Sequence, residues 1–365
     1  MDEEEEWPET WDRNKVYMYT DPTGIKVPVP YGFTASGVES EKYVNTGLVI
    51  YEGEIEALNS EEWTEEEAWQ ASLDKNQFVW IPVENASERI YESNGENNPK
   101  KARLYNFIGS NITNSNGSKN EPSIIRTPKY DNKLQILSFL GFQDNSKDSL
   151  YKILQIDFDS CMNSIEKYGG FYIGRYETGN ISQESPVVRR MSTDIWCQNW
   201  YTMYNRMKNI SNNENIYTSM IWGCLWDETL RWLVDTGDKS LNDVAYSSTS
   251  WGNFYRTSFT YRTTSGSTAT KQASKRTRIP TGSSDRNKAN NIYDLAGNVL
   301  EWTLEVQSNG RMGRGGAYTD DAASSSYVGY RGGINYYESY PTWNNNGGGA
   351  GYFTGYGFRA ILYIR

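Results

Sequence analysis

The sequence predicts an α+β fold that contains much irregular loop. Short runs rich in β-branched and aromatic residues, each bounded by turn residues, predict strands, and four amphipathic stretches predict helices. Long stretches rich in Asn, Ser and Gly separate these elements, and they show neither the hydrophobic alternation of a strand nor the hydrophobic period of a helix. With 13 Trp, 28 Tyr and 11 Phe among 365 residues, the chain can bury a sizeable core as one large domain or two ordinary ones.

The first 74 residues predict an acidic tail followed by a small β-rich module. The tail MDEEEEWPET lacks the basic and apolar regions of a secretory signal. Short apolar pieces at Lys26–Pro30 and Thr46–Tyr51 alternate with turn residues and predict strands, and Ser60–Leu73 predicts a short acidic helix. We expect residues 1–74 to attach the protein to a virion or to a cell surface.

Residues 75–365 predict a second, larger domain. Phe78–Val83 (FVWIPV) predicts a strand, because β-branched and aromatic residues fill it and a proline lies near its end. Residues 84–132 are polar without periodicity and predict loop. Asp157–Tyr168 predicts a helix that the two following glycines end, and Phe171–Glu177 (FYIGRYE) alternates as a strand.

The middle of this domain predicts two more helices. Thr193–Lys208 places apolar residues on one helical face, with Ser192 as the N-cap. Trp226–Val234 predicts the next helix, with Gly237 beyond its end. Residues 235–291 are mostly irregular, which in a compact domain indicates a segment that wraps a surface or forms part of a site.

Composition argues against several classes of function. A formal net charge of −10 and the lack of a basic stripe argue against nucleic-acid binding, which depends on Lys and Arg. No run of about 18 apolar residues is present, so we expect no membrane insertion. The chain has no histidine, which removes Ser-His-Asp and Cys-His nucleophiles and His-ligated zinc. The cysteines show no CxxC spacing, and we expect each to be a small buried hydrophobe: Cys161, Cys197 and Cys224.

Three short motifs stand out in the C-terminal part of the chain. They are Asn291–Glu305 (NIYDLAGNVLEWTLE), Arg314–Tyr318 (RGGAY) and Gly357–Arg359 (GFR). Their glycines permit backbone geometry or close approaches that a Cβ would forbid. We expect the motif residues to build a scaffold: Gly297, Asn298, Glu301, Trp302, Arg314, Gly315, Gly316, Gly357, Phe358 and Arg359.

Together these motifs resemble the formylglycine-generating-enzyme (sulfatase-modifying-factor) branch of the C-type lectin fold, whose motifs run roughly L-Y-D-M-A-G-N-V-W-E-W, R-G-G-S-[WYF] and G-F-R. Tyr293–Trp302 matches the first motif with two conservative departures, Leu295 and Leu300. The resemblance covers about residues 77–365, because the earlier strands and the helix near Trp200 fall in the order of that family. It implies a C-type lectin fold for the larger domain.

The resemblance also bears on chemistry. Enzymes of the family oxidise a substrate cysteine with a cysteine pair between the RGG and GFR motifs, and the sulfoxide-forming relatives use a histidine-bound iron. This chain has no cysteine after Cys224 and no histidine. We therefore expect a non-catalytic member that requires no cofactor.

Two scaffold residues carry further expectations. Arg359 has a ready buried partner in a carboxylate, either Glu301 or Asp294. Asn298 and Glu301 also have oxygen atoms at a spacing that family members use for calcium. A hydrogen-bonded turn explains the same residues, and a hard cation needs six or more oxygen ligands. Both interpretations stay open.

A segment of biased composition lies between the RGG and GFR motifs. From Ala317 to Tyr356, 26 of 40 residues are Tyr, Gly, Ser, Asn or Asp. Tyrosine gives a large rigid contact area at low entropy cost, and the small polar residues adapt their hydrogen bonds to different partners. We expect a ligand-binding region over about residues 316–358, with its contact residues at the surface. They are Tyr318, Asp320, Asp321, Ser324, Ser325, Tyr327, Tyr330, Asn335, Tyr336, Tyr337, Tyr340, Trp343, Asn344, Asn345, Asn346 and Tyr352.

The region is also similar to that of the variable proteins of diversity-generating retroelements, which carry diversified residues on this fold between an RGG-like motif and a terminal GFR. Mutation of the adenines in AAC codons gives Tyr, Asp, Ser, Gly, His, Ile, Thr or Ala, and unmutated codons give Asn. Members of that set dominate the segment, and Asn344–Asn346 looks like unmutated template. A lectin loop diversified by ordinary evolution is the alternative.

Three functions follow as hypotheses. The first is a recognition protein, a phage tail receptor-binding protein or a surface adhesin, whose ligand is a protein or glycan of a bacterial cell. Such a protein lies on a virion or outside a cell. The second is an oxidase of the formylglycine-generating type, and the third is a carbohydrate-binding lectin of fixed specificity.

Overall fold

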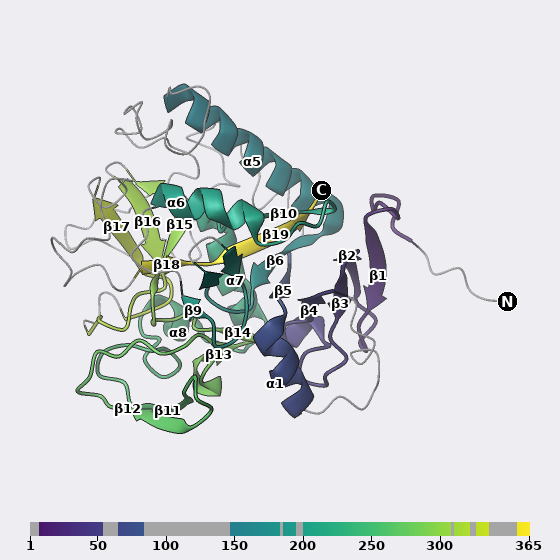
Figure 1. The fold of residues 1–365 in the computed structure, drawn as a ribbon. Helices are drawn as coiled ribbons and strands as arrows, with labels where there is room; N and C mark the ends of the chain where they lie inside the picture. Colours follow the sequence, from purple (N-terminus) through teal and green to yellow (C-terminus); the bar gives the residue numbers. More distant parts are fainter. Residues whose placement is uncertain are drawn as a thin grey trace.

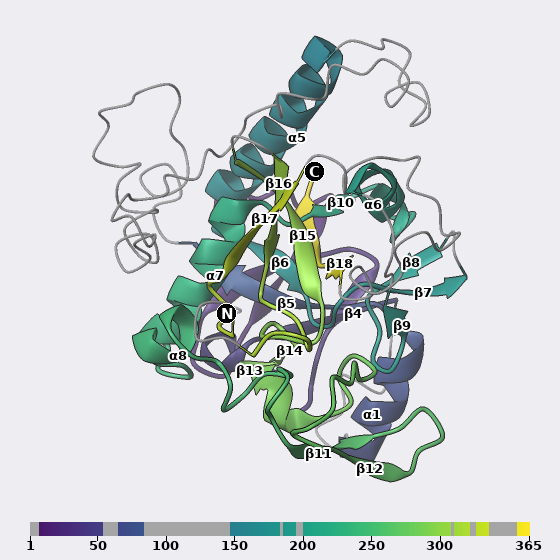
Figure 2. The ribbon, with the colours of Figure 1, turned by 90° about the vertical axis from the view of Figure 1, so that its left-hand side faces the viewer.

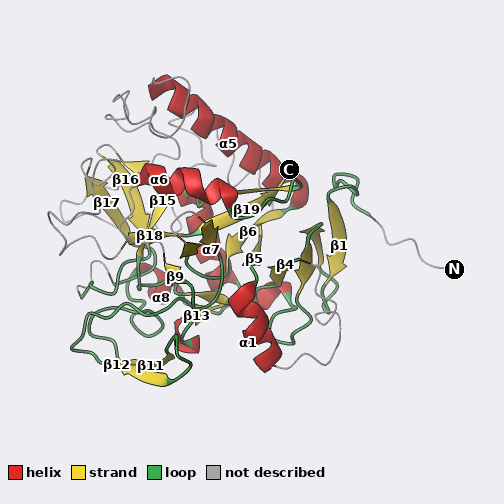
Figure 3. Ribbon diagram, viewed as in Figure 1, coloured by secondary structure: helices red, strands yellow, loops and turns green. Residues whose placement is uncertain are grey.

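The α+β class is confirmed by the computed structural model, in which strands predominate and long loops connect many of them (Figure 3). The structure describes residues 7–53, 65–83, 147–182, 185–194, 200–307, 310–321, 326–335 and 356–365. The loop expected at residues 84–132 lies outside these ranges.

A six-stranded antiparallel sheet occupies the centre of the molecule (Figure 1). Its strand order is β10-β19-β6-β5-β4-β3, so the first and the last parts of the chain meet in one sheet. The side chains of β6 and β19 are buried on both faces, which explains their near-continuous apolar sequences. The strands are β3 (Phe33–Ala35), β4 (Val49–Glu52), β5 (Gln77–Pro82), β6 (Gly170–Gly174), β10 (Ile216–Met220) and β19 (Ala360–Ile364).

Two of the N-terminal strands, β3 and β4, belong to this sheet, so residues 1–74 do not form a separate module. Ile50 of β4 pairs with Phe78 of β5. The expected boundary between residues 74 and 75 therefore divides two strands that are hydrogen-bonded to each other. One apolar core includes residues from both sides of that boundary. Beside the sheet lies the hairpin of β1 (Val16–Thr20) and β2 (Lys26–Pro30).

Helices pack against this sheet. α5 (Lys147–Tyr168) contacts β6 and β19, and α7 (Gly223–Asp235) contacts β5 and β15. The helix predicted from Asp157 thus begins earlier, at Lys147, and it ends as predicted at Gly169, whose φ is 78°. The shorter helices are α1 (Glu65–Asp74) and α8 (Leu241–Ala245).

The helix predicted over Thr193–Lys208 is shorter than expected. Thr193 and Asp194 form β9 and pair with β7 (Gly179–Ser182), which also pairs with β8 (Ser185–Val187). Ser192 is not an N-cap, because its hydroxyl donates to the carbonyl of Arg189. Strand pairing overrides the helical pattern at this end. The helix is α6 (Trp200–Arg206), followed by a 3-10 turn at Met207–Asn209.

A four-stranded sheet, in the order β17-β16-β15-β18, lies next to the central sheet (Figures 1 and 2). β18 runs parallel to β15 and passes through Arg359 directly into β19, so the chain joins the two sheets there. β17 lies within the compositionally biased segment and was not predicted. The strands are β15 (Leu300–Gln307), β16 (Gly310–Arg314), β17 (Arg331–Asn335) and β18 (Tyr356–Phe358).

The expected irregular stretch at residues 235–291 is largely loop, but it includes a hairpin. The hairpin and α1 lie on the same side of the molecule in Figures 1 and 2. It consists of β11 (Phe259–Arg262) and β12 (Thr268–Lys271), and the shorter pair β13 (Lys288–Ala289) and β14 (Ile292–Tyr293) follows. Within the described ranges, no helix combines the length and apolar character that a bilayer span requires.

Candidate functional site

The first scaffold motif forms a tight turn built from left-handed residues. Asp294, Gly297 and Asn298 have φ values of 53°, 76° and 59°. Asp and Asn tolerate this region better than other residues with a Cβ. A Cβ at Gly297 would lie 2.3 Å from the carbonyl oxygen of Asn253, so only glycine fits there.

Asn298 holds this turn to three other segments. Its Nδ2 donates to Glu177 Oε2 at 2.6 Å and to the carbonyl of Ile279 at 3.2 Å. Its Oδ1 accepts from Asn253 Nδ2 at 2.9 Å and from the backbone N–H of Ile279 at 3.0 Å. The whole hydrogen-bonding capacity of this buried amide is therefore used inside the protein.

Glu301 and Arg359 form a buried bidentate ion pair. Arg359 Nη2 lies 2.6 Å from Glu301 Oε1, and Nε lies 2.9 Å from Oε2, with neither side chain exposed. Nη1 donates to the carbonyl of Gly174, and Nη2 also donates to the carbonyl of Tyr293. Burial raises the pKa of the Glu301 carboxyl, and the charge of Arg359 opposes that rise. Because each of these buried charges is compensated by the other, removing either one would be costly.

This pair confirms one of the two partners expected for Arg359. The other candidate, Asp294, accepts instead from the backbone N–H of Gly282 and from Asn287 Nδ2. Trp302 is buried in the core, as expected. Cys161 and Cys224 are buried, which confirms that expectation for both; Cys197 lies outside the described residues.

The same hydrogen bonds bear on the calcium alternative. The side-chain oxygens of Asn298 and Glu301 all accept from donors of the protein itself. These contacts are the ones expected of a hydrogen-bonded turn, which was the alternative to a calcium site. Among the described residues, no group of three or more Asp, Glu, Cys or His side chains is placed to hold a metal.

The second motif is fastened to the first. Arg314 forms a buried ion pair with Asp227 of α7, and its guanidinium lies over the ring of Trp226. Gly315 accepts at its carbonyl from the N–H of Gly297 at 2.9 Å. Gly315 and Gly316 both have positive φ, at 91° and 75°. The RGG motif thus turns the chain out of β16 at a fixed place on the frame.

The segment that we expect to bind a ligand begins directly after this turn. The N–H of Tyr318 donates to the carbonyl of Asn298, and the N–H of Tyr255 donates to the carbonyl of Asp320. Asp320 Oδ2 accepts from the N–H of Ala317 at 2.9 Å. Burial raises the pKa of Asp320 to about 6, with a further contribution from Asp321 and an opposing one from that N–H.

Two tyrosines expected at the surface are buried. Tyr318 is 9% exposed and Tyr327 is 7% exposed. Tyr327 contacts the half-buried Tyr330 edge to face, and the next carbonyl, of Val328, accepts from Trp226 Nε1. These tyrosines therefore support the frame, because the chain around them packs on α7 and α8. Composition alone could not separate them from tyrosines that point outward.

The remaining contact residues divide into two groups. Asp321 is exposed, and Asn335 is the last residue of β17. The others lie outside the described residues: Ser324, Ser325, Tyr336, Tyr337, Tyr340, Trp343, Asn344, Asn345, Asn346 and Tyr352.

The frame fixes both ends of the stretch 336–355. Asn335 ends β17, opposite Gly310 at one end of the four-stranded sheet. Tyr356 begins β18 opposite Leu300, at the other end of β15. β17 and β18 are also the two outer strands of this sheet. The chain between them therefore leaves from one edge and returns at the opposite edge.

A basic region beside this segment is not among the features predicted from the sequence. Between Asp243 and Asp285 the chain has six Lys and Arg and no Asp or Glu. Arg256 lies 3.7 Å from Asp321, which places this region against the start of the ligand-binding segment. The net charge of −10 hides such a local cluster, whereas the spacing of acidic residues would have revealed it.

Comparisons with the models of known protein families, with curated proteins and with solved structures gave no match for this chain.

Proposed function

We propose that this protein is a non-catalytic recognition protein on a C-type lectin frame of the formylglycine-generating-enzyme kind, and that it binds ligand through the segment Ala317–Tyr356. One observation carries the proposal. The stretch 336–355, rich in Tyr, Asn and Gly, starts and ends on two outer strands of a sheet whose own polar motif residues are buried and paired with one another. A rigid frame with a segment of this composition is the arrangement of a display surface.

The frame itself offers little to catalysis. Glu301, Arg359, Asn298 and Arg314 are buried and engaged within the protein. Burial also raises the pKa of the Cys161 thiol well above its usual range, which suppresses the reactive thiolate. The motif residues therefore act as scaffold, and the aromatic and small polar residues of the segment act as contacts.

The ligand in this proposal is a protein or glycan on a bacterial cell, and the protein is carried by a phage tail or a cell surface. The composition of the segment favours diversification by a retroelement. That part has a genetic test: a near-copy of the C-terminal coding sequence, differing at adenines, beside a reverse-transcriptase gene. Absence of both from the locus would reject the retroelement origin and leave the recognition role standing.

Adsorption of labelled protein to a panel of bacterial isolates tests recognition. We expect replacement of Tyr336, Tyr340 and Trp343 by Ser to reduce adsorption to a binding isolate by at least about tenfold, because aromatic anchors carry most of the energy of such surfaces. Tyr31→Ser is the matched control, since Tyr31 is 46% exposed and directly follows the N-terminal hairpin β1–β2. Equal adsorption of the two variants would contradict the proposal.

Turnover in a copper-dependent assay of cysteine-peptide oxidation would contradict the non-catalytic role.

A further inference from the structure

The region between Asp243 and Asp285 is basic within an acidic protein. Its cations are Arg256, Arg262, Lys271, Lys275, Arg276 and Arg278. They surround the β11–β12 hairpin, which lies far from the N-terminal hairpin β1–β2 in Figure 1. A local concentration of one charge on a protein of the opposite net charge focuses the field at that place.

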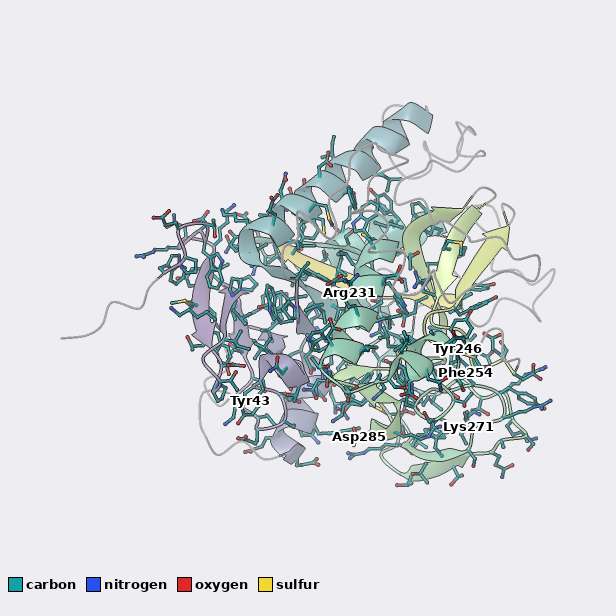
Figure 4. All side chains as sticks on the ribbon, turned by 180° about the vertical axis from the view of Figure 1, so that it is seen from behind. Tyr43, Arg231, Tyr246, Phe254, Lys271 and Asp285 are labelled. Atoms are coloured by element: carbon teal, nitrogen blue, oxygen red, sulfur yellow. The ribbon has the colours of Figure 1, made fainter. Side chains whose placement is uncertain are left out.

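Not all of these cations are available to a ligand. Lys271 is 1% exposed and donates to the carbonyls of Phe254 and Thr257 at 2.6 and 2.7 Å; Figure 4 labels Lys271 and Phe254. Arg262 lies over the ring of Trp69 in α1, at 4.2 Å from its centroid. These two hold the hairpin in place.

Other cations of this region are exposed at the surface, and an aromatic ring contacts two of them. The Arg256 side chain is 76% exposed, and Lys275 and Arg276 are also exposed. Arg276 and Arg256 both lie over the ring of Tyr255, at 4.6 and 5.9 Å from its centroid. Stacking on an aromatic ring limits the freedom of a guanidinium, so less entropy is lost when it binds an anion. Asp321 is the acidic group near this cluster, at 3.7 Å from Arg256.

The outer face of the hairpin adds hydroxyl groups. Thr260 pairs with Thr270 and Arg262 pairs with Thr268, so these four side chains share one face of the two strands. The three threonines are exposed, while Phe259 and Lys271 on the opposite face are buried. Exposed threonine hydroxyls on a hairpin that is flanked in sequence by these cations suit a ligand that carries both hydroxyl and acidic groups.

From this we propose that the hairpin and its flanking loops bind an acidic polysaccharide whose carboxylates meet Arg256, Lys275 and Arg276. Guanidinium groups match carboxylates in a planar, bidentate geometry, and the threonine face takes sugar hydroxyls. Three exposed cations fit a chain with one charge per sugar. Duplex DNA, with one charge per about 1.7 Å of its axis, has a charge density that three exposed cations match poorly. None of the residues of this site belongs to the stretch 336–355.

Polygalacturonate and its fully methyl-esterified form are matched probes, because they share a backbone and differ in charge. We expect the protein to bind the acid form, with an affinity that falls as salt rises. Replacement of Arg256, Lys275 and Arg276 by Gln should weaken binding by at least about tenfold. The control replaces Arg13, Lys26 and Lys167 by Gln, which removes the same charge from parts of the chain away from the hairpin, and should change affinity less than about twofold.

Several results would overturn this assignment. They are equal binding by the two triple variants, equal binding of acid and ester, and tighter binding of a single-stranded oligonucleotide than of polygalacturonate at the same salt. Circular dichroism of both variants is the check that they are folded. The Tyr336, Tyr340 and Trp343 variant separates the two proposals: it should keep polygalacturonate binding while it loses adsorption to cells.

Discussion

At the scale of single residues, the start of the ligand-binding segment depends on one carboxyl. Asp320 accepts from the N–H of Ala317, and its carbonyl accepts from Tyr255. Its pKa of about 6 lies above the ordinary value of 3.8, so the folded protein binds this proton more tightly than the unfolded chain. The stabilisation is therefore complete below about pH 3.8 and is lost as pH rises through about 6.

The substitution Asp320→Asn tests the direction of this pH dependence of stability. The amide keeps an oxygen to accept from Ala317 and carries no buried charge. At pH 7.5 we expect the variant to be more stable than the parent by about 1–3 kcal/mol, since the shift is about two pKa units. At pH 3.5 the gain should vanish. Thermal unfolding at both pH values measures it, and Asp321→Asn, at an exposed neighbour, should change stability by less than about 0.5 kcal/mol. A gain that is the same at both pH values would contradict the assignment.

Residue types allowed some of the site to be predicted. A buried arginine near two carboxylates needs a partner, and Glu301 is that partner for Arg359. Sequence could not show which tyrosines face outward, because the burial of Tyr318 and Tyr327 depends on how the folded chain packs around them. It could not place Arg256 beside Asp321 either, since that contact depends on the path of a long loop.

At the scale of elements, the turn between β14 and β15 depends on a close approach of two backbones. Gly297 has positive φ, and its missing Cβ leaves room for the carbonyl of Asn253. Gly266, in the loop of the β11–β12 hairpin, has a similar φ of 82° but no atom within 4 Å of a Cβ built there. Substitutions at these two glycines therefore separate the free-energy cost of a positive φ from that of a steric clash with the backbone.

We expect Gly266→Ala to lower the free energy of unfolding by about 1 kcal/mol, from backbone conformation alone. Gly297→Ala should lower it by about 2–5 kcal/mol, because the carbonyl of Asn253 must also move. Urea titration of both variants measures the difference. Equal losses would mean that the turn relaxes without strain and that the approach is not required.

The sequence predicts an element best where its hydrophobic period and its length indicate the same type of secondary structure. β5 and α7 were predicted within a few residues, because an apolar β-branched run and a helical stripe have few competing interpretations. The helix at Thr193–Lys208 was wrong at its start, since Thr193 and Asp194 pair with β7. The pairing of strands far apart in sequence leaves no local signal.

At the scale of the whole molecule, the N-terminal strands complete the fold. Removing residues 1–74 would take β3 and β4 from the central sheet and leave β5 as an edge. It would also remove apolar side chains from the main core. An attachment role for residues 1–74 would thus have to coexist with a structural one.

A fragment of residues 75–365 should therefore fail to fold, giving aggregated protein or a far-ultraviolet spectrum without a cooperative thermal transition. A fragment that starts at Trp7 is the control, and it should melt like the full chain, because Trp7 and Trp11 pack on Val16. A folded, cooperative fragment 75–365 would restore the two-domain division that the sequence suggested.

The two outer strands that hold residues 336–355 also decide how this protein can change over generations. The entropic cost of closing a loop grows only with the logarithm of its length, about 0.6 kcal/mol for each doubling. Both anchor strands are bound to β15 and β16 through backbone hydrogen bonds, which do not depend on the side chains between them. Insertions and deletions should then be tolerated as readily as substitutions. The size of the proposed ligand-binding surface, as well as its chemistry, would then be open to selection.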